Sequence, residues 1–150
     1  MRPEIRDAGL NDYPAWRDLW DRYCAFYETQ LADDITRMTW ARIVDPSASM
    51  SCRVACIDGG IVGFANYVLH PSTWTRTDSC YLEDLFVAES ARGRGIGRAL
   101  IDDLMKLGRA SGWARLYWHT HAGNAAARRV YDPFSHADNF VRYRIALTQV

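Results

Sequence analysis

Apolar residues recur along the chain with two periods, one helical and one typical of strands. Near the start, Trp16, Leu19, Trp20 and Tyr23 recur at helical spacing, which indicates one buried helix face. The same period, with capping residues before it and proline or glycine after it, predicts four helices. They span Tyr13 to about Glu28, Asp33 or Asp34 to about Val44, the turn at 92–97 to about Arg109, and Asn124–Tyr131.

Runs rich in β-branched and aromatic residues predict six strands. Asp58-Gly59-Gly60 separates the second strand from the third and is typical of a tight hairpin. The strands span Glu4–Arg6, Arg53–Ile57, Ile61–Leu69, Ser79–Val87, Ala114–Thr120 and Phe140–Leu147. Helices and strands therefore follow each other in a mixed α/β order. Because the 150 residues contain no linker or repeat, we expect a single domain over residues 1–150.

Composition narrows the class of protein and the kind of partner. Hydrophobic residues make up 49% of the chain and charged residues 24%, which is the balance of a globular domain. A net charge of zero gives no general attraction to nucleic acid or to an anionic membrane, and no apolar run is long enough to cross a bilayer. The four cysteines lack the spacing of a zinc site and lie among apolar residues. We therefore expect buried free thiols in a reducing cytoplasm.

The stretch from Tyr81 to Leu100 carries the strongest functional signal. An apolar strand runs into the turn Arg92-Gly93-Arg94-Gly95-Ile96-Gly97, and a helix that includes Arg98 follows. Glycines let the backbone approach a phosphate closely, and the free N–H groups of a first helical turn point at it. The arginines add positive charge at the same place. The segment therefore predicts a pyrophosphate site; a turn that only caps a helix is the simpler alternative.

The glycine spacing of this turn shows which kind of nucleotide-binding loop it matches. A Walker A loop ends in Gly-Lys-Ser/Thr, and a dinucleotide fingerprint belongs to a first strand–helix unit, so neither matches. Arg92, Gly95 and Gly97 instead match Arg/Gln-x-x-Gly-x-Gly/Ala, the acyl-CoA pyrophosphate loop of the GNAT superfamily of N-acetyltransferases, which the chain resembles. The resemblance implies the GNAT acyl-CoA N-acyltransferase fold, an α/β fold whose mixed central sheet is splayed around the CoA cleft.

The resemblance also implies acetyl-CoA as cosubstrate and a set of residues that bind it. The pantetheine arm is expected to pair with the strand before the turn, and the Leu85 N–H to polarise the thioester carbonyl. Asn124-x-x-Ala127-Arg128-x-Val130-Tyr131 matches the family's Asn-x-x-Ala-Arg-x-Leu-Tyr helix, in which the tyrosine protonates the CoA sulfur; an ordinary core tyrosine is the alternative. The implied cofactor-binding residues are Leu85, Phe86, Val87, Arg92, Gly93, Arg94, Gly95, Ile96, Gly97, Arg98, Asn124 and Ala127, and Tyr131 is the implied proton donor.

Glu83 and Asp84 are the only charges in an otherwise apolar strand, where buried carboxylates are costly. Glu83 is the candidate general base and Asp84 a candidate acceptor-binding residue, while ion-paired or edge-exposed acids are the alternative. Consecutive strand residues face opposite sides, so the two acids share one role only if a bulge reorients them. The Leu-Glu-Asp pattern resembles GNAT members that acetylate polyamines and other small cationic amines. Other members place the base at the position of Tyr81.

Further acceptor contacts are predicted from aromatic and acidic residues. Tyr27 and Glu28 end the first predicted helix, where the family closes over its acceptor and where cation–π contacts suit an amine. A solvated loop with helix caps is the competing interpretation. Trp118 is expected at the edge of the cleft. His119 and His121 would share one strand face, but no third ligand with suitable spacing follows, so no metal is predicted.

The sequence thus predicts an N-acetyltransferase that moves the acetyl group of acetyl-CoA to a small cationic primary amine by direct attack. Two alternatives stay open: an acyl-CoA-binding module of the same fold without turnover, and a protein or peptide N-acetyltransferase. Asn139 stands where the family commonly has glycine, and Pro133 and Phe134 replace helix-extending residues. These departures are expected to change the wall of the acceptor site more than the CoA-binding site. The sequence leaves homodimerisation open.

Overall fold

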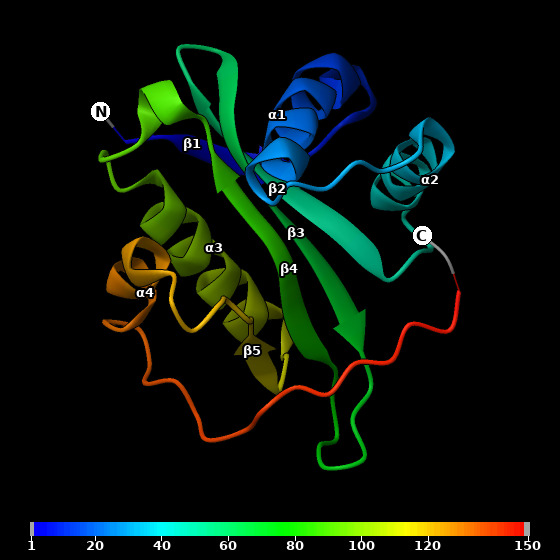
Figure 1. Ribbon diagram of the computed structural model, residues 1–150, viewed down its shortest axis with the longest axis vertical. Helices are drawn as coiled ribbons and strands as arrows, with labels where there is room; N and C mark the ends of the chain where they lie inside the picture. Colours follow the sequence, from blue (N-terminus) through cyan, green and yellow to red (C-terminus); the bar gives the residue numbers. More distant parts are fainter. Residues whose placement is uncertain (1, 149–150) are drawn as a thin grey trace. The chain divides into compact units, whose positions relative to one another are not determined.

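The computed structural model describes residues 2–148. The chain divides into two compact units, the first ending at His119 and the second beginning at Thr120, and each is described by itself. The first unit contains β1 (Glu4–Asp7), the 3-10 turn η1 (Leu10–Asp12), α1 (Tyr13–Phe26), α2 (Asp33–Ile43), β2 (Met50–Ile57), β3 (Gly60–His70), β4 (Ser79–Val87), the 3-10 turn η2 (Glu89–Ala91), α3 (Ile96–Ser111) and β5 (Arg115–Tyr117) (Figure 1). The second unit contains α4 (Ala125–Tyr131). None of the described helices has both the length and the apolar character that a membrane span requires.

Five strands form one sheet in the order β1-β2-β3-β4-β5. Neighbouring strands are antiparallel except β4 and β5, which run parallel, so the sheet is mixed as predicted. Asp58 and Gly59 connect β2 to β3 with φ angles of 51° and 80°. These left-handed values are the ones that a two-residue hairpin turn of this kind requires. The hairpin predicted from Asp58-Gly59-Gly60 is therefore confirmed.

Helices cover both faces of this sheet. Gly63 and Phe64 are consecutive on β3, so they point to opposite faces. A Cβ on Gly63 would lie 3.5 Å from a methyl group of Ile96 in α3, whereas the centroid of the Phe64 ring lies 6.2 Å from that of Trp20 in α1. α3 therefore packs on one face of the sheet, and α1 packs on the other.

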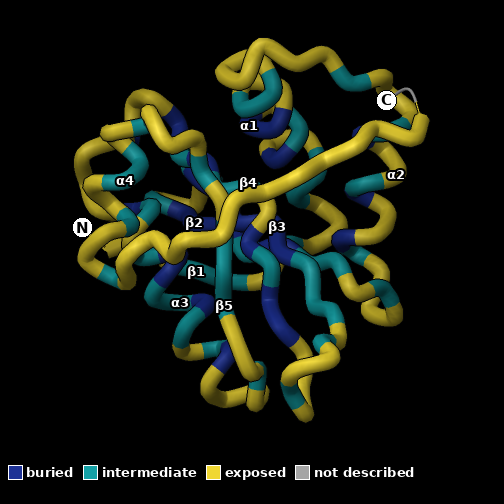
Figure 2. Tube along the Cα trace, turned by 60° about the horizontal axis from the view of Figure 1, so that its bottom comes forward, coloured by how far each residue is buried: buried dark blue, intermediate teal, exposed yellow. Residues whose placement is uncertain are grey.

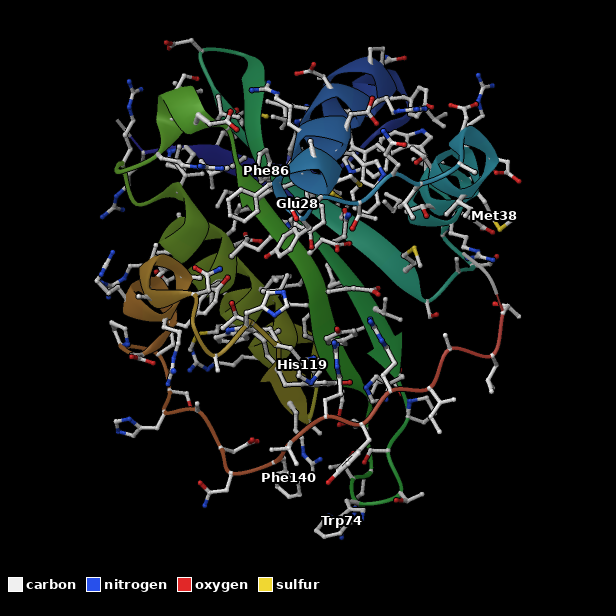
Figure 3. The ribbon with its side chains drawn as sticks, viewed as in Figure 1. Glu28, Met38, Trp74, Phe86, His119 and Phe140 are labelled. Atoms are coloured by element: carbon white, nitrogen blue, oxygen red, sulfur yellow. The ribbon has the colours of Figure 1, made fainter. Side chains whose placement is uncertain are left out.

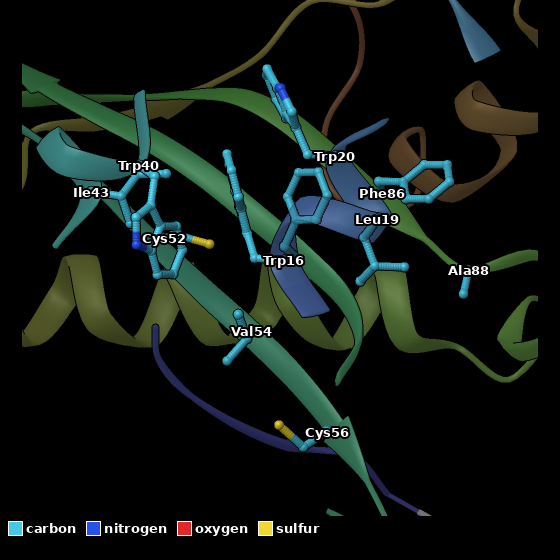
Figure 4. Close-up of a cluster of buried hydrophobic side chains, with 11 residues drawn as sticks. Trp16, Leu19, Trp20, Trp40, Ile43, Cys52, Val54, Cys56, Phe86 and Ala88 are labelled. Carbon is cyan, nitrogen blue, oxygen red and sulfur yellow. The ribbon is translucent and has the colours of Figure 1, made fainter. Parts of the chain in front are cut away.

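The larger hydrophobic core lies between the sheet and the helices α1 and α2 (Figure 4). Trp16 is fully buried at its centre, where it stacks on Trp20 with ring centroids 5.3 Å apart and meets Trp40 of α2 at 5.0 Å. Large stacked rings of this kind add to the free energy of burial through their geometry. The buried face predicted from the spacing of Trp16, Leu19 and Trp20 is confirmed.

The start and end of α1 differ in detail from the prediction. Asp12 directly precedes α1, but its carboxylate accepts hydrogen bonds from the Gly9 N–H and from Arg6 Nη1, both at 2.7 Å, and does not cap the helix. The helix ends at Phe26 rather than at about Glu28. Glu28 has a φ of 52°, and this left-handed conformation cannot continue a right-handed helix.

Two of the predicted strands are wrong in extent or in existence. β5 covers only Arg115–Tyr117 of the predicted Ala114–Thr120. Its ladder with β4 ends at Tyr81, close to a bulge in β4, and a bulge bends the strand that contains it. Residues 140–147, predicted as a strand, have no regular secondary structure. Their large apolar side chains are 74–91% exposed (Figure 2). β-rich composition forms a stable strand only where neighbouring strands pair with it, and none of the described strands pairs with this segment.

The contact between α3 and Trp113 gives a prediction about stability. Gly108 lies in α3, and an added Cβ would approach Trp113 Cε3 to 2.8 Å. Alanine is usually better than glycine in a helix by about 1 kcal/mol, but overpacking an interior costs about 1–3 kcal/mol. Gly108→Ala should therefore lower the midpoint of thermal unfolding followed by circular dichroism. Gly97→Ala, in the same helix with its nearest atom at 3.9 Å, is the control and should not lower it. An unchanged midpoint for Gly108→Ala would contradict this reasoning.

Candidate active site

The turn between β4 and α3 has the form of an anion site. Gly93 and Gly95 have φ angles of 77° and 74°, which glycine adopts without strain. α3 starts at Ile96 directly after Gly95, which has no side chain to cap the helix. The N–H groups of the first helical turn are therefore left for another acceptor. No described atom lies within 4 Å of a Cβ placed on Gly93 or on Gly95, so a ligand can approach this backbone closely.

Arg92 holds this turn against the end of β4. Its Nε donates to the Val87 carbonyl at 3.0 Å. Its guanidinium lies over the rings of Phe86 and Phe26, at 5.4 Å and 5.8 Å from their centroids. Contacts of a cation with a ring are each worth about 0.5–1 kcal/mol at exposed sites. Arg92 thus has a positioning role that the sequence analysis did not anticipate, in addition to its predicted place in the phosphate loop.

β4 has an open edge along its second half. Its ladder with β5 covers only Ser79–Tyr81, whereas its ladder with β3 continues to Val87. From Leu82 to Val87, the described chain pairs no strand with the β5 side of β4. An extended ligand that carries amide groups can add to such an edge as a further strand. Leu85, predicted to face the cosubstrate, lies within this open edge.

A β-bulge sets the direction of the side chains on β4. Asn66 of β3 pairs with Asp84, while the next residue, Tyr67, pairs with Leu82, so Glu83 is an extra residue in the ladder. In a regular strand Asp84 and Leu82 would face the same side. With the bulge they face opposite sides, and Asp84 faces α1. A bulge, which the sequence analysis named as a possibility, is therefore present at this place.

Asp84 is mostly buried and belongs to a chain of hydrogen bonds beneath α1. The hydroxyl of Tyr23 donates to Oδ1 of Asp84 at 2.8 Å, and Nδ2 of Asn66 donates to Oδ2 at 3.2 Å. Trp16 Nε1 donates to the Asn66 side-chain oxygen at 3.4 Å, which fixes the orientation of the amide. Each carboxylate oxygen has a second lone pair, so Asp84 can accept a further hydrogen bond from a ligand.

These surroundings move the pKa of Asp84 toward neutrality. Burial raises the pKa from its ordinary 3.8 to about 6, the Glu83 charge adds to the rise, and the hydrogen bonds from Tyr23 and Asn66 oppose it. Burial and the Asp84 charge also raise the pKa of Tyr23 and that of Tyr27. The same two causes raise the pKa of the Cys24 thiol to about 11. A carboxyl group that titrates near neutral pH is suited to general acid–base catalysis.

The acids and rings predicted at the end of α1 lie in two places. The Tyr27 ring lies 5.0 Å from the Tyr23 ring and within the field of Asp84. Glu28, labelled in Figure 3, lines a pocket of about 780 Å³ at the loop between α1 and α2. The walls of this pocket also include Asp21, Cys24, Ala25, Thr29 and Thr36. Tyr27 therefore lies beside Asp84, and Glu28 faces the neighbouring pocket. Glu83, the candidate base, is exposed at the bulge.

Four ring side chains gather where the ladder between β4 and β5 ends. Tyr81 and Tyr117 stack with centroids 5.1 Å apart. His119 Nδ1 lies 3.3 Å from the Tyr81 hydroxyl, and His70 Nε2 lies 2.6 Å from the Tyr117 hydroxyl. Asn66 and Val68 are two residues apart on β3, so their partners Asp84 and Tyr81 face the same side of the sheet. The rings therefore lie on the face of the sheet that also carries Asp84.

The histidine pair considered as metal ligands does not lie on a strand. β5 ends at Tyr117, so it reaches neither His119 nor His121, and Trp118 follows directly after the strand. Trp118 is half-buried. Within residues 2–148, no three His, Cys, Asp or Glu side chains come together as a metal site.

The second unit contains the other predicted cosubstrate residues. Asn124 caps α4, and its side-chain oxygen accepts a hydrogen bond from the Ala127 N–H at 3.1 Å. Tyr131 is the last residue of α4 and is half-buried. The spacing of Asn124, Ala127 and Tyr131 places them on one side of the helix. The helix predicted over Asn124–Tyr131 is therefore present from Ala125, and Asn124 is its N-cap, a role that the sequence analysis did not predict.

Sequence reasoning missed two partners of Asp84. Neither Tyr23 nor Asn66 was predicted to contact Asp84. A signal was present, because Asn66 is an amide in the middle of the apolar run Ile61–Leu69. Buried polar side chains are nearly always hydrogen-bonded, so an amide at this place indicates a second polar group opposite it.

The sequence matches the acetyltransferase (GNAT) family over residues 13–134, which is most of the chain. The chain belongs to the GNAT acetyltransferase family. It is 31% identical over 135 residues to the D-amino-acid N-acetyltransferase HPA3 of Saccharomyces cerevisiae, covering 89% of this chain and 84% of that protein. Among solved structures it resembles a probable acetyltransferase with a TM-score of 0.87, 20% identity, and coverage of 98% of this chain and 99% of the other. It also resembles AAC(6')-Iy in complex with the bisubstrate analog CoA-S-monomethyl-acetylneamine, with a TM-score of 0.81, 20% identity, and coverage of 97% and 99%.

The family and the fold predicted from the sequence are thereby confirmed. As a GNAT acetyltransferase, the chain is an acetyl-CoA-dependent acyltransferase enzyme. The residues present suit that cosubstrate, because the exposed glycine backbone at Gly93 and Gly95 suits a diphosphate. The open edge of β4 suits the amide groups of a pantetheine arm.

The buried carboxyl of Asp84 gives this GNAT acetyltransferase a predicted dependence of stability on pH. Because its pKa is raised from 3.8 to about 6, the folded state binds this proton more tightly than the unfolded state. The contribution of Asp84 to folding therefore falls as the pH rises through that window, by about 3 kcal/mol in total. Asp84→Asn, whose amide can still bond to Tyr23 and Asn66, should lack this loss. The free energy of urea unfolding at about pH 4 and about pH 8 measures the difference.

Glu83→Gln is the matched control for this measurement, since Glu83 is adjacent in sequence but exposed. Its free energy of unfolding should fall between about pH 4 and about pH 8 by as much as that of the unmodified protein. Equal pH dependence in Asp84→Asn and the unmodified protein would show that Asp84 does not titrate in this window.

Proposed function

We propose that the chain transfers the acetyl group of acetyl-CoA to the primary amine of a small molecule. The observation that carries the proposal is the open edge of β4, which leads directly into the glycine turn and the uncapped start of α3. A carboxyl group with a pKa near neutrality lies on the same strand. The curated relative is named as an N-acetyltransferase of D-amino acids, which also carry a primary amine.

The cosubstrate is held by backbone groups in this proposal. The N–H groups of the turn from Gly93 to Arg98 donate hydrogen bonds to the diphosphate, and the side chains of Arg94 and Arg98 add positive charge. The edge of β4 at Leu85 and Val87 pairs with the pantetheine arm, and Phe86 packs behind it beside Arg92. The Leu85 N–H donates to the thioester carbonyl and stabilises the charge that develops there. Asn124 and Ala127 of α4 remain predicted cosubstrate residues of this proposal.

The acceptor is a small amine, cationic in solution, that first loses one proton to water and then attacks as the neutral amine without a covalent enzyme intermediate. A bond forms between the amine nitrogen and the carbonyl carbon, and the bond from that carbon to sulfur breaks. The nitrogen loses a proton to a carboxylate of β4, and the thiolate gains one from Tyr131. Asp84, Glu83 and Glu28 supply negative charge for the ammonium group, while the rings of Tyr27 and Trp118 offer faces for a cation.

Calorimetry and turnover test this proposal together. The protein should bind coenzyme A with a measurable heat, and it should release free thiol from acetyl-CoA in the presence of an amine. A suitable panel contains a D-amino acid, spermidine, neamine and a peptide that begins with alanine. Turnover with one of the first three confirms a small-molecule acceptor.

Other outcomes of the panel have distinct meanings. Tight binding of coenzyme A without thiol release for any amine would indicate a binding module. Turnover with the peptide alone would indicate peptide acetylation. Absence of coenzyme A binding by folded protein would remove the proposal altogether.

The role of Tyr131 gives a separate prediction. If its hydroxyl protonates the departing thiolate, Tyr131→Phe should lower kcat by about 10²–10⁴-fold. The affinity for coenzyme A should change little, because the ring and the capped helix remain. Steady-state kinetics and calorimetry on the same protein make the comparison. Tyr143→Phe, at an exposed position, is the control. A kcat within about twofold of the unmodified enzyme would exclude Tyr131 as the main proton donor.

A further inference from the structure

Two adjacent acids on β4 differ sharply in their surroundings. Glu83 is the extra residue of the bulge and is exposed. Asp84 is mostly buried, and its two oxygens accept hydrogen bonds from Tyr23 at 2.8 Å and from Asn66 at 3.2 Å. Only Asp84 is held in one orientation by groups on two different elements. A proton acceptor needs such a fixed position relative to the atom that loses the proton.

We propose that Asp84, held by Tyr23 and Asn66, is the group that takes the proton from the acceptor amine, and that Glu83 is not. The inference rests on the proposed acetyl transfer and names the base within it. In the step, the amine nitrogen bonds to the acetyl carbon, the carbon–sulfur bond breaks, and the proton on nitrogen moves to a carboxylate oxygen of Asp84. Tyr23 and Asn66 act through Asp84 and are positioning residues.

The charges around Asp84 support this assignment. On α1, Tyr23 faces it with a neutral hydroxyl and Cys24 with a neutral thiol, and directly after α1 Tyr27 faces it with a neutral hydroxyl. On β2, the buried Cys52 thiol also feels its charge, and on β4 Glu83 repels it. Among the described residues, burial raises the pKa of Asp84 most, the donors Tyr23 and Asn66 lower it, and the Glu83 charge raises it, while no arginine or lysine contributes. An ammonium group arriving here therefore meets a carboxylate that lacks a cationic partner.

The hydrogen-bond geometry leaves room for the proton to be accepted. Tyr23 uses one lone pair of Oδ1 and Asn66 one lone pair of Oδ2. The second lone pair on each oxygen stays available for an N–H of the acceptor. Trp16 holds the Asn66 amide from behind, so the Asn66 NH2 group points steadily at Asp84. The carboxylate is thus preorganised by the aromatic core of α1.

The test is the pH dependence of kcat/KM, measured with the amine from the panel that turns over fastest. Two protons must leave before reaction, one from the ammonium and one from Asp84. Below the pKa of Asp84, kcat/KM is therefore inversely proportional to the square of the proton concentration. Between that pKa and the pKa of the amine, kcat/KM is inversely proportional to its first power. Asp84→Asn should lower kcat/KM by about 10²–10⁴-fold and remove the change of slope. Coenzyme A affinity should be retained.

A second variant reports on positioning without removing the base. Tyr23→Phe keeps the ring that packs on Phe64 and Phe86 but removes the hydrogen bond to the ionised carboxylate. It should raise the pKa of Asp84 and move the change of slope upward by about one to two pH units. A purely structural role of Tyr23 would not move it. Asp78→Asn, at an exposed loop position, is the matched control for loss of a carboxylate.

The outcomes separate this inference from the proposed function. The base assignment is overturned if Asp84→Asn keeps the change of slope, or if Glu83→Gln abolishes it. If Asp84→Asn does not fold, Tyr23→Phe decides alone, and an unshifted profile overturns the assignment. An unmodified enzyme that binds coenzyme A but acetylates no amine overturns the proposed function itself.

Discussion

The extra residue at Glu83 determines what each face of β4 can do. It places Asp84 and Phe86 on the side of α1, while Leu82 pairs with Tyr67, whose ring packs on Trp113 beside α3. A one-residue change of register moves every following side chain to the other face. Without the bulge, the Asp84 carboxylate would face the buried apolar side of α3, where its charge would be costly. The ladder to β5 ends just before the bulge, so the same irregularity accompanies both the oriented acid and the open strand edge.

The aromatic core of α1 serves the site as well as stability. Trp16 and Tyr23 bury their rings against the sheet, yet each directs a polar atom into the Asp84 chain. Buried tryptophan and tyrosine usually find such partners. The core thereby holds a carboxylate whose burial raises its pKa, and this is destabilising at neutral pH. The proposed role of Asp84 as the base accounts for this loss, because active sites commonly give up some stability for function.

Features that depend on neighbouring residues in sequence could be predicted, and features that depend on distant partners could not. β4 is confirmed at both ends, Ser79 and Val87, because an apolar run between turn signals is a local pattern. The Asp58–Gly59 hairpin is local too. The partners of Asp84 lie 61 residues away at Tyr23 and 18 residues away at Asn66, and no local period relates them. The prediction for residues 140–147 failed for the same reason, since a strand needs a neighbour that its own sequence does not specify.

The thiols of the chain favour direct transfer over a cysteinyl intermediate. Catalytic cysteines need a lowered pKa, because the thiolate is the nucleophile. Burial instead raises the pKa of Cys80 to about 12, and burial with the Asp84 charge raises that of Cys24 to about 11. Both thiols are therefore protonated at neutral pH. A disfavoured thiolate supports the proposal that the amine attacks the thioester itself. In that proposal the protein moves protons, for which a carboxylate near neutrality is a suited group.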